Sequence, residues 1–313
     1  MLIENVAKLS PIERFIYWIR ERHLIYLRKR DGQDKPWTDD DILMDNYFTC
    51  PYRENDKTTA WFRENIRDPL RNSQAVVFAT ICFRWFNLIE TGQCLLNGYD
   101  LTAKPGNVFK TPLGEWAVHS GELEDILREK RDQKEKIFTG AFMINSPKGK
   151  QKLEAICERL DAIWEGMPEL LEDIDKLRKP YRMQDVHEML TRFDGMGNFM
   201  SYEVVCDLRY TYLLDNALDK CTWCNPGPGA VRGLYRVLER DFKKGNNTVA
   251  PPTPDDWQEQ TCELLKFAQR KLNKLPPLEM REIEMSLCEY DKYERILFAD
   301  GRGKRKYNGR TND

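Results

Sequence analysis

The sequence lacks several features that would quickly assign it to a class of protein. Its net charge is only −2, from 49 Lys and Arg against 51 Asp and Glu, so any nucleic-acid binding must come from local basic patches. It has three histidines in 313 residues, so histidine-based metal or triad chemistry is poorly supplied. It contains no Gly-x4-Gly-Lys-Ser/Thr sequence, and we therefore do not expect a P-loop kinase.

Long hydrophobic runs are also missing. The stretch "AVVFATICF" at 75–83 is far short of a membrane span, and the N-terminus has no basic region followed by an apolar run. We expect no membrane association and a cytoplasmic protein, in the host cytoplasm if a phage encodes it. Nine scattered cysteines, an odd number, indicate reduced thiols. "CTWC" at 221–224 has the spacing of half a zinc site but no second pair, so we predict no metal site.

Helical periodicity runs through most of the chain. "SPIERFIYWIRERHLIYLRKRDG" at 10–32 opens with a capping box of Ser10 and Glu13. "NSQAVVFATICFRWFNLIETG" at 72–92 is apolar on most sides and predicts a helix buried all round. A short β-hairpin could lie at 106–121, "GNVFKTPLGEWAVHSG". We predict an all-α fold: one helical domain of two packed lobes over 1–298, then a basic, mobile tail over 299–313.

Two glycines interrupt this helical pattern in "FDGMGNFMSYEVVCDLRY" at 193–210. Gly195 and Gly197 bracket a methionine before a small residue and a helix, which matches the hairpin of a helix-hairpin-helix unit within about 180–240. In such a hairpin, backbone N–H groups at a helix N-terminus can hold a DNA phosphate without side-chain charge. A plain tight turn between packed helices would explain the same letters. The DNA-binding candidates are Gly195, Gly197, Gly227, Gly229 and Arg232.

The segment that follows, "YLLDNALDKCTWCNPGPGAVRGLYRVL" at 212–238, resembles the helix-hairpin-helix DNA glycosylases. In those enzymes an aspartate follows the hairpin at a distance similar to that of Asp215. The resemblance implies a base-excising activity in which this carboxylate stabilises an oxocarbenium-like centre. If no glycosidic bond is cut, Asp215 would serve only to orient the base or to cap a helix.

A second resemblance spans most of residues 10–298. It rests on "FTCPYRENDKTTAWFREN", "CFRWFN", "FTGAFMIN", the glycine segment above, "NPGPGAVRGL" and "EIEMSLCEYDKYER". With these segments the chain resembles the helical alpha-glutamyl/putrescinyl thymine pyrophosphorylases of phage, which are related to the helical domain of 5-hydroxymethyluracil DNA kinases. None of the segments matches the kinase half, which favours the transferase members.

The second resemblance implies a defined chemistry. The amine of an amino acid or polyamine would displace pyrophosphate from the C5 methylene of 5-pyrophosphoryloxymethyl-deoxyuridine in double-stranded DNA. This requires cations for the leaving group, a carboxylate to take a proton and aromatics to hold an extruded base. No cofactor is required, although Mg²⁺ could escort the pyrophosphate. A 5-hydroxymethyluracil DNA kinase is a further candidate partner, and a non-catalytic DNA-binding subunit is the alternative to an enzyme.

Candidate ligands for pyrophosphate come from "PYRENDKTTAWFREN" at 51–65. Helical spacing would place Arg53 and Lys57 on one stripe beside Trp61, and Asp56 and Arg63 on the neighbouring stripe. A solvated face with i,i+4 ion pairs explains the same letters. Arg84 interrupts an apolar helix, so it needs a partner such as a carboxylate or a ligand phosphate, and we favour a functional role.

Candidate general bases come from the last helical segment. Glu284 and Asp291 lie on a stripe next to the core face, where desolvation would raise their pKa; ion pairs with Lys292 or Arg295 would explain the same letters. The candidate bases are Asp291, Glu284, Asp56, Asp207 and Asp215. The candidate pyrophosphate ligands are Arg53, Lys57, Arg63, Arg84, Lys292 and Arg295.

Overall fold

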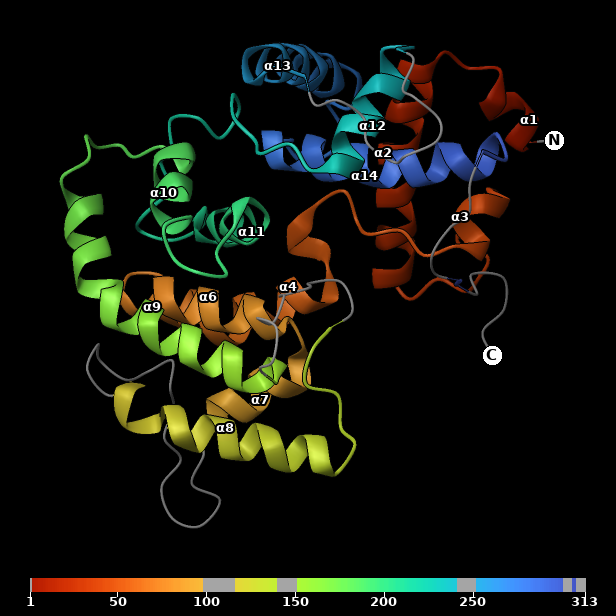
Figure 1. Ribbon diagram of the computed structural model, residues 1–313. Coiled ribbons are helices and arrows are strands. Elements are labelled where there is room, and N and C mark those ends of the chain that lie inside the picture. The colour runs from red at the N-terminus through yellow and green to blue at the C-terminus, as the bar shows by residue number, and fades with distance from the viewer. Residues whose placement is uncertain (1, 98–115, 140–150, 241–251, 301–305, 308–313) are drawn as a thin grey trace. The chain divides into compact units, whose positions relative to one another are not determined.

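The computed structural model describes residues 2–97, 116–139, 151–240, 252–300 and 306–307 (Figure 1). Within these ranges all regular elements are helices, and extended residues pair only in an isolated bridge between Asn46 and Lys306. The predicted all-α fold is therefore confirmed. Most of the predicted β-hairpin at 106–121 lies outside the described residues, but its last residues belong to helix α8. The predicted tail also lies largely outside them.

The chain divides into two compact units, which are treated separately below. The first consists of Met1–Asp56 and Lys220–Asp313, and the second of Lys57–Asp219. The first unit contains α1 (Leu2–Ala7), α2 (Pro11–Arg30), α3 (Asp41–Asp45), α12 (Pro228–Val237), α13 (Pro254–Lys271) and α14 (Met280–Leu297). The second contains α4 (Lys57–Phe62), α5 (Asp68–Leu70), α6 (Ala75–Phe86), α7 (Ile89–Asn97), α8 (Trp116–Asp132), α9 (Lys152–Asp175), α10 (Met183–Leu190) and α11 (Asn198–Leu208).

The first unit is organised around α2, α12 and α14. The predicted capping box starts α2, because the backbone N–H of Ser10 donates to Glu13 Oε2 at 3.0 Å. Aromatic residues of α2 and α14 form the core, with Phe15 and Tyr290 in an edge-to-face contact at 5.4 Å between ring centroids. Figure 1 shows α12 lying against α14. Two helices from distant parts of the sequence are thus packed on the same C-terminal helix.

Close backbone approach holds α12 on α14. A Cβ added at Gly233 would lie 2.0 Å from the carbonyl oxygen of Leu287, and one added at Gly229 would lie 2.5 Å from Cys288 Sγ. At Gly233 no side chain fits without a shift of the α14 backbone, whereas at Gly229 the side chain of Cys288 would have to move. Two glycines one helical turn apart therefore allow the two helix backbones to meet directly.

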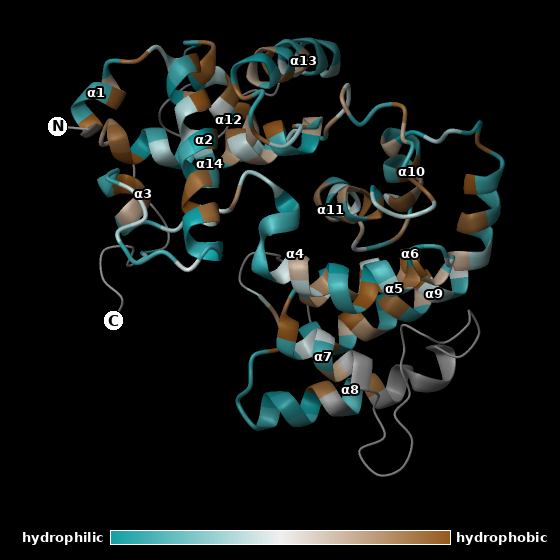
Figure 2. Cartoon of the chain, turned by 180° about the vertical axis from the view of Figure 1, so that it is seen from behind, coloured by the Kyte–Doolittle hydropathy of each residue, from teal (hydrophilic) through white to brown (hydrophobic). Residues whose placement is uncertain are grey.

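The second unit is built around α6. Every residue of α6 from Val76 to Phe86 is buried, as its apolar sequence predicts, and Figure 2 shows hydrophobic residues along this helix. The helix ends at Asn87, whose φ of 47° lies in the left-handed region. Helices α9 and α11 pack on α6, and α8 packs on α9. The buried helix therefore supports α11, the helix that follows the glycine pair.

Residues 53–64 do not form the continuous helix that their spacing predicts. Arg53–Asn55 is a single 3-10 turn, Asp56 is extended with φ −71° and ψ 136°, and α4 begins only at Lys57. The boundary between the two units falls at the same place. The predicted stripe that joined Arg53 to Lys57 is therefore wrong, because the hydrogen bond from the Asp56 N–H to the Arg53 carbonyl closes the turn before a helix can propagate.

Candidate nucleic-acid interface and charged clusters

The turn between α10 and α11 contains the two glycines that the sequence brings into focus. Gly195 has φ +83°, in the left-handed region that favours glycine, and a Cβ there would lie 2.9 Å from the Trp85 ring. Gly197 is the residue before α11, with extended geometry of φ −64° and ψ 176°. No heavy atom of the described chain lies within 4 Å of the position that a Cβ would take at Gly197. The first glycine is required by the turn, and the second borders open space.

Side chains fix this turn on both flanks. The Ser201 hydroxyl donates to the Met196 carbonyl at 2.7 Å, and the Trp85 indole N–H points to Met196 Sδ at 3.1 Å. His187 Nε2 lies 3.0 Å from the Asn198 carbonyl oxygen. Burial lowers the pKa of His187, so the ring is neutral near pH 7 and Nε2–H is the donor. The start of α11 is therefore held in one geometry.

Arg84 and Asp207, two residues predicted for different roles, are partners in the second unit. The Arg84 Nη2 donates to Asp207 Oδ1 at 3.0 Å, and Arg84 Nε donates to Asp207 Oδ2. Further bonds run from Arg84 to Asn87 Oδ1 at 2.7 Å and to Thr59 Oγ1 at 3.1 Å. The exposed fractions of the two side chains are 2% and 0%. The partner that a buried arginine requires is thus a carboxylate, and the pair ties α6 to α11.

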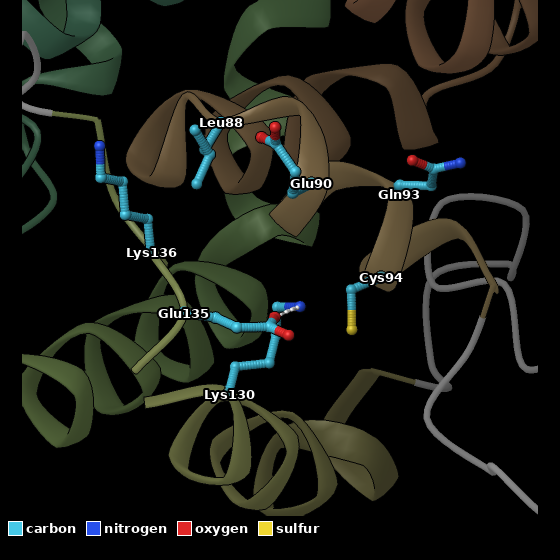
Figure 3. Close-up of a pocket in the computed structure, with 7 residues that line it drawn as sticks. All are labelled: Leu88, Glu90, Gln93, Cys94, Lys130, Glu135 and Lys136. Carbon is cyan, nitrogen blue, oxygen red and sulfur yellow. Dashed lines mark hydrogen bonds and ion pairs between the residues drawn. The ribbon is translucent and has the colours of Figure 1, made fainter. Parts of the chain in front are cut away.

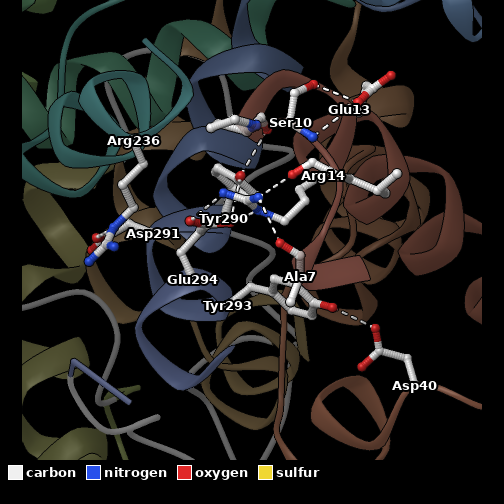
Figure 4. A network of polar contacts seen from close by, with 12 residues as sticks. Ala7, Ser10, Glu13, Arg14, Asp40, Arg236, Tyr290, Asp291, Tyr293 and Glu294 are labelled. Atoms are coloured by element: carbon white, nitrogen blue, oxygen red, sulfur yellow. Dashed lines mark hydrogen bonds and ion pairs between the residues drawn. The ribbon is translucent and has the colours of Figure 1, made fainter. Parts of the chain in front are cut away.

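A second charged cluster lies on α12 and α14 in the first unit (Figure 4). Asp291 Oδ2 accepts a hydrogen bond from Arg232 Nε at 3.0 Å, and Oδ1 accepts one from Arg236 Nε at 2.9 Å. Arg295 is 3.4 Å from the same carboxylate. Asp291 and Arg295 are therefore brought together as the sequence suggested, and Arg232, which was predicted to contact DNA, pairs with the same carboxylate. Lys292 instead pairs with Glu289.

Arg236 is the member of this cluster that the sequence analysis missed. It follows Arg232 by four residues and so shares a face of α12, and it also pairs with Asp300 at 3.0 Å. The i,i+4 repeat of arginines in "VRGLYRVL" was the signal that could have found it. Both carboxylate oxygens of Asp291 are consequently occupied by guanidinium groups.

Glu284 lies beside the start of α12. Its Oε1 accepts a hydrogen bond from the Gly227 N–H at 3.4 Å, so a carboxylate sits at the positive end of this helix. The side chain is half-buried. One turn further along α14, burial raises the pKa of the Cys288 thiol to about 12, which keeps it protonated. Glu284 therefore combines partial solvent access with a helix N-terminus.

Other polar side chains of α14 connect it to the N-terminal part of the chain. Glu294 accepts from Arg14 Nε at 2.6 Å and from the Tyr290 hydroxyl at 2.7 Å. Asp40 Oδ2 accepts from the Tyr293 hydroxyl at 2.7 Å and from the Tyr17 hydroxyl at 3.0 Å (Figure 4). Burial raises the pKa of Asp40. These contacts explain much of the unusual composition of "EIEMSLCEYDKYER" as internal cross-links.

The other predicted site residues are dispersed. Arg63 lies in a π-helical turn, Arg63–Arg67, and pairs with Glu64 at 2.8 Å. Asp215 is exposed; its Oδ1 accepts from Asn216 Nδ2 at 2.8 Å, and its backbone carbonyl accepts from Arg209 Nη1 at 2.7 Å. Arg53 and Asp56 belong to the first unit and Lys57 to the second. Their predicted roles in catalysis or pyrophosphate binding stay predictions.

A cavity of about 590 Å³ lies between α7, the end of α8 and the segment that follows α8 (Figure 3). Its walls carry two carboxylates and two ammonium groups, and Lys130 pairs with Glu135. Burial raises the pKa of Cys94, so its thiol is protonated. The lining residues are Leu88, Glu90, Gln93, Cys94, Lys130, Glu135 and Lys136. With carboxylates and ammonium groups on its walls, this cavity can hold a ligand that carries both signs of charge.

A neighbouring cavity of about 420 Å³ shares Glu135 with the first. The Lys152 ammonium lies 4.3 Å from the centre of the Phe138 ring there, and burial lowers the pKa of this lysine.

In the described parts of the chain, no group of three His, Cys, Asp or Glu side chains is arranged to hold a metal ion. Cys262 Sγ lies near the carbonyl oxygens of Cys221 and Thr222, at 3.9 and 3.7 Å. Across the same residues, no helix is both long and apolar enough to cross a membrane.

Comparison with known proteins identifies the family. The model of the 5-hmdU DNA kinase helical domain, where 5-hmdU is 5-hydroxymethyldeoxyuridine, matches residues 10–303, and this chain belongs to that family. The 5-hmdU DNA kinase of Bacillus phage SP10 is 25% identical over 326 aligned residues, which cover 96% of this chain and 48% of the relative. The chain thus spans about half the length of this curated relative. No solved structure matches it.

Proposed function

We propose that this protein acts on double-stranded DNA that contains 5-hydroxymethyluracil or a derivative of that base. The observation that carries this proposal is the family match over residues 10–303, which includes helices from both units. The relative from phage SP10 is named for a reaction on the same modified nucleoside in DNA. The shared part is helical and contains the glycine turn before α11, which supports a role in contacting the DNA.

The reaction that we propose is the transfer of an amine to the modified base. The donor nitrogen attacks the C5 methylene of 5-pyrophosphoryloxymethyl-deoxyuridine, so that a C–N bond forms, the C–O bond breaks and pyrophosphate leaves. Before the attack, the ammonium group of the donor loses one proton to a general base. After the C–N bond has formed, the product amine exchanges its remaining extra proton with water. Asp291, Glu284, Asp56, Asp207 and Asp215 stay the candidate bases, although both oxygens of Asp291 already pair with guanidinium groups.

The cavity between α7 and α8 supports an amino acid as the donor. Glu90 and Glu135 can pair with an ammonium group, and Lys130 and Lys136 can pair with a carboxylate. Because Lys130 already pairs with Glu135, a ligand would meet one further carboxylate, Glu90, and one further ammonium group, Lys136. This pair matches the two charges of a zwitterion better than the two positive charges of a polyamine such as putrescine. We therefore propose an amino acid over a polyamine.

Backbone phosphates of the DNA are proposed to lie at the turn before α11. The N–H groups at the start of a helix suit an anion, and the space beside Gly197 is open. The glycines within α12 have a different environment, because Gly229 and Gly233 are used in packing on α14. A DNA contact by Gly227, Gly229 or Arg232 stays a prediction.

The test uses the full chain, a duplex with one 5-pyrophosphoryloxymethyl-uracil, and a mixture of amino acids and polyamines. The DNA is digested, and its nucleosides are analysed by mass spectrometry while released pyrophosphate is measured. We expect an amino-acid adduct and one pyrophosphate per adduct. An abasic site with free base would show a glycosylase instead, and binding without any product would show a non-catalytic subunit. Absence of DNA binding would contradict the whole proposal.

A further inference from the structure

The cavity of about 420 Å³ beside Phe138 has walls of two chemical kinds. Its apolar part consists of Ile137, Phe138 and Leu153, and the first and last of these side chains are buried. Its cationic part consists of Arg131 at the end of α8 and Lys152, the first residue of α9. The volume lies within the range of roughly 300–1,000 Å³ that small-molecule sites occupy. The cavity therefore suits a ligand with an apolar body and an anionic group.

Lys152 gives this cavity a positive charge that no described carboxylate neutralises. Its ammonium group lies over the Phe138 ring and forms no ion pair with any carboxylate that the structure describes. Glu154, the acidic residue in the same turn of α9, does not line the cavity. A ring face offsets only part of the cost of removing an ammonium group from water. An anionic ligand would supply the partner that this lysine lacks.

The other charges around the cavity are already paired. Arg131 Nη2 lies 3.1 Å from Asp132 Oδ1, and Arg131 Nη1 donates to Gln151 Oε1 at 2.9 Å. Glu135, the carboxylate among the described lining residues, pairs with Lys130. The charge that remains for a ligand is therefore the positive charge of Lys152.

Glu135 also connects this cavity to the larger one between α7 and α8. Its side chain lines both cavities, so the two sites are neighbours within the second unit. The proposed reaction needs the donor nitrogen and the C5 methylene of the base to come into contact. Two neighbouring cavities of different chemistry, one for a zwitterion and one for an anion with an apolar body, meet this need.

We propose that the cavity beside Phe138 holds the extruded pyrimidine base, with the Lys152 ammonium bound to its pyrophosphate. This inference rests on the proposed function and assigns a place to the acceptor of the amine. The ring of the base would lie among the apolar side chains, as an extruded base does in the pocket of an enzyme that modifies it. Lys152 is thus the residue that distinguishes the pyrophosphorylated base from an unmodified one.

The test compares the affinity of the full chain for two labelled duplexes, one with a single 5-pyrophosphoryloxymethyl-uracil and one with thymine at that position. The buffer contains no primary amine, so the modified base stays intact. The parent should prefer the pyrophosphorylated duplex by about tenfold, a typical effect of one charged hydrogen bond. Lys152→Gln should lose this preference and keep its affinity for the thymine duplex. Lys152→Arg should keep the preference, because a guanidinium also binds phosphate.

Lys134→Gln is the matched control, because Lys134 is exposed in the same part of the chain and lines neither cavity. It removes the same charge and should keep the preference of the parent. Labelling of amines with an acylating reagent, analysed by mass spectrometry of peptides, gives a second readout. The pyrophosphorylated duplex should slow the labelling of Lys152 more than the thymine duplex does, and Lys134 should be labelled equally with both.

The possible outcomes separate this inference from the proposed function. A parent-like preference in Lys152→Gln would overturn the inference, as would a parent protein that binds both duplexes equally. An equal loss of affinity for both duplexes in Lys152→Gln would show a contact to a backbone phosphate of the DNA, and would also overturn it. Failure of the parent protein to bind either duplex would instead overturn the proposed function.

Discussion

Two helices of this protein start directly after a glycine, α11 in one unit and α12 in the other. The glycines in and around these two helices serve different structural purposes. Gly197 before α11 borders open space, and Gly195 supplies the positive φ of the turn. In α12, Gly229 and Gly233 allow the helix to touch Cys288 and Leu287 of α14 directly. A similar glycine-containing sequence therefore lies at a candidate contact surface in α11 and at a packing interface in α12.

The two helices are also anchored differently. Helix α11 is held near its C-terminal end by a buried ion pair with Arg84, which leaves its first turn accessible. Helix α12 is held along its length by backbone contact and by Asp291, which pairs with Arg232 and Arg236. A helix anchored at the far end can offer its N-terminus to a ligand, and this difference can be tested at each anchor.

The largest expected effect comes from the anchor of α11. Asp207→Ala leaves the Arg84 guanidinium buried without its carboxylate, so the free energy of unfolding should fall by about 3–5 kcal/mol. Urea unfolding followed by circular dichroism measures the change. The double variant Arg84→Met with Asp207→Leu removes both charges and should recover much of the loss. A decrease below about 1 kcal/mol for Asp207→Ala would contradict the anchoring role.

Gly233→Ala should lower the free energy of unfolding, whereas the same substitution inside an ordinary helix raises it. Alanine usually stabilises a helix interior relative to glycine by about 0.5–1 kcal/mol. Here its Cβ would be 2.0 Å from a backbone oxygen, so we expect a loss of about 1–3 kcal/mol. Gly197→Ala is the matched control and should change stability by no more than about 0.5 kcal/mol. Stabilisation by Gly233→Ala in urea unfolding would show that α12 does not touch α14.

The open turn should respond in DNA binding and not in stability. Gly197→Val adds a branched side chain where the described protein leaves room, so the fold should survive while the approach of a phosphate is obstructed. We expect affinity for the modified duplex to fall about tenfold, equivalent to about 1.4 kcal/mol. Fluorescence anisotropy measures the affinity and circular dichroism verifies the helical content. Unchanged affinity would remove this turn from the DNA interface.

The smallest effect concerns pH and the histidine beneath the turn. Burial lowers the folded-state pKa of His187 below the usual histidine value of 6.5. Below pH 6.5 the unfolded chain therefore binds a proton more readily than the folded protein does. Stability should therefore be full above pH 6.5 and decrease as the pH falls, by at most about 1.4 kcal/mol per pH unit. His187→Gln should make the profile flatter. A profile that is identical in the variant would show that His187 titrates normally in the folded state.

Local signals in the sequence account for part of this structure. The capping box at Ser10, the buried apolar helix α6 and the all-α fold follow from periodicity and end residues. The break at Asp56 did not follow, because a single 3-10 turn has no strong signature in the sequence. The spacing that favoured a continuous helix there was also compatible with a short helix that starts at Lys57.

Long-range partners could not be derived in the same way. The sequence predicts that Arg84 needs a partner, because it interrupts an apolar helix. That this partner is Asp207 depends on how α11 packs across α6. The packing role of Gly229 and Gly233 likewise depends on the register of α12 on α14, which no local pattern encodes. Sequence reasoning therefore identified most residues of the charged clusters and few of their pairings.

Hydrogen exchange with mass spectrometry, on the full chain with and without a modified duplex, tests most directly whether α11 and not α12 presents its N-terminus to DNA. The account predicts slower exchange on DNA addition for amides in residues 195–200, where the turn and the first residues of α11 lie. Amides in residues 229–233 should exchange at an unchanged rate, because they are already packed on α14. Protection confined to 229–233, with none at 195–200, would contradict it.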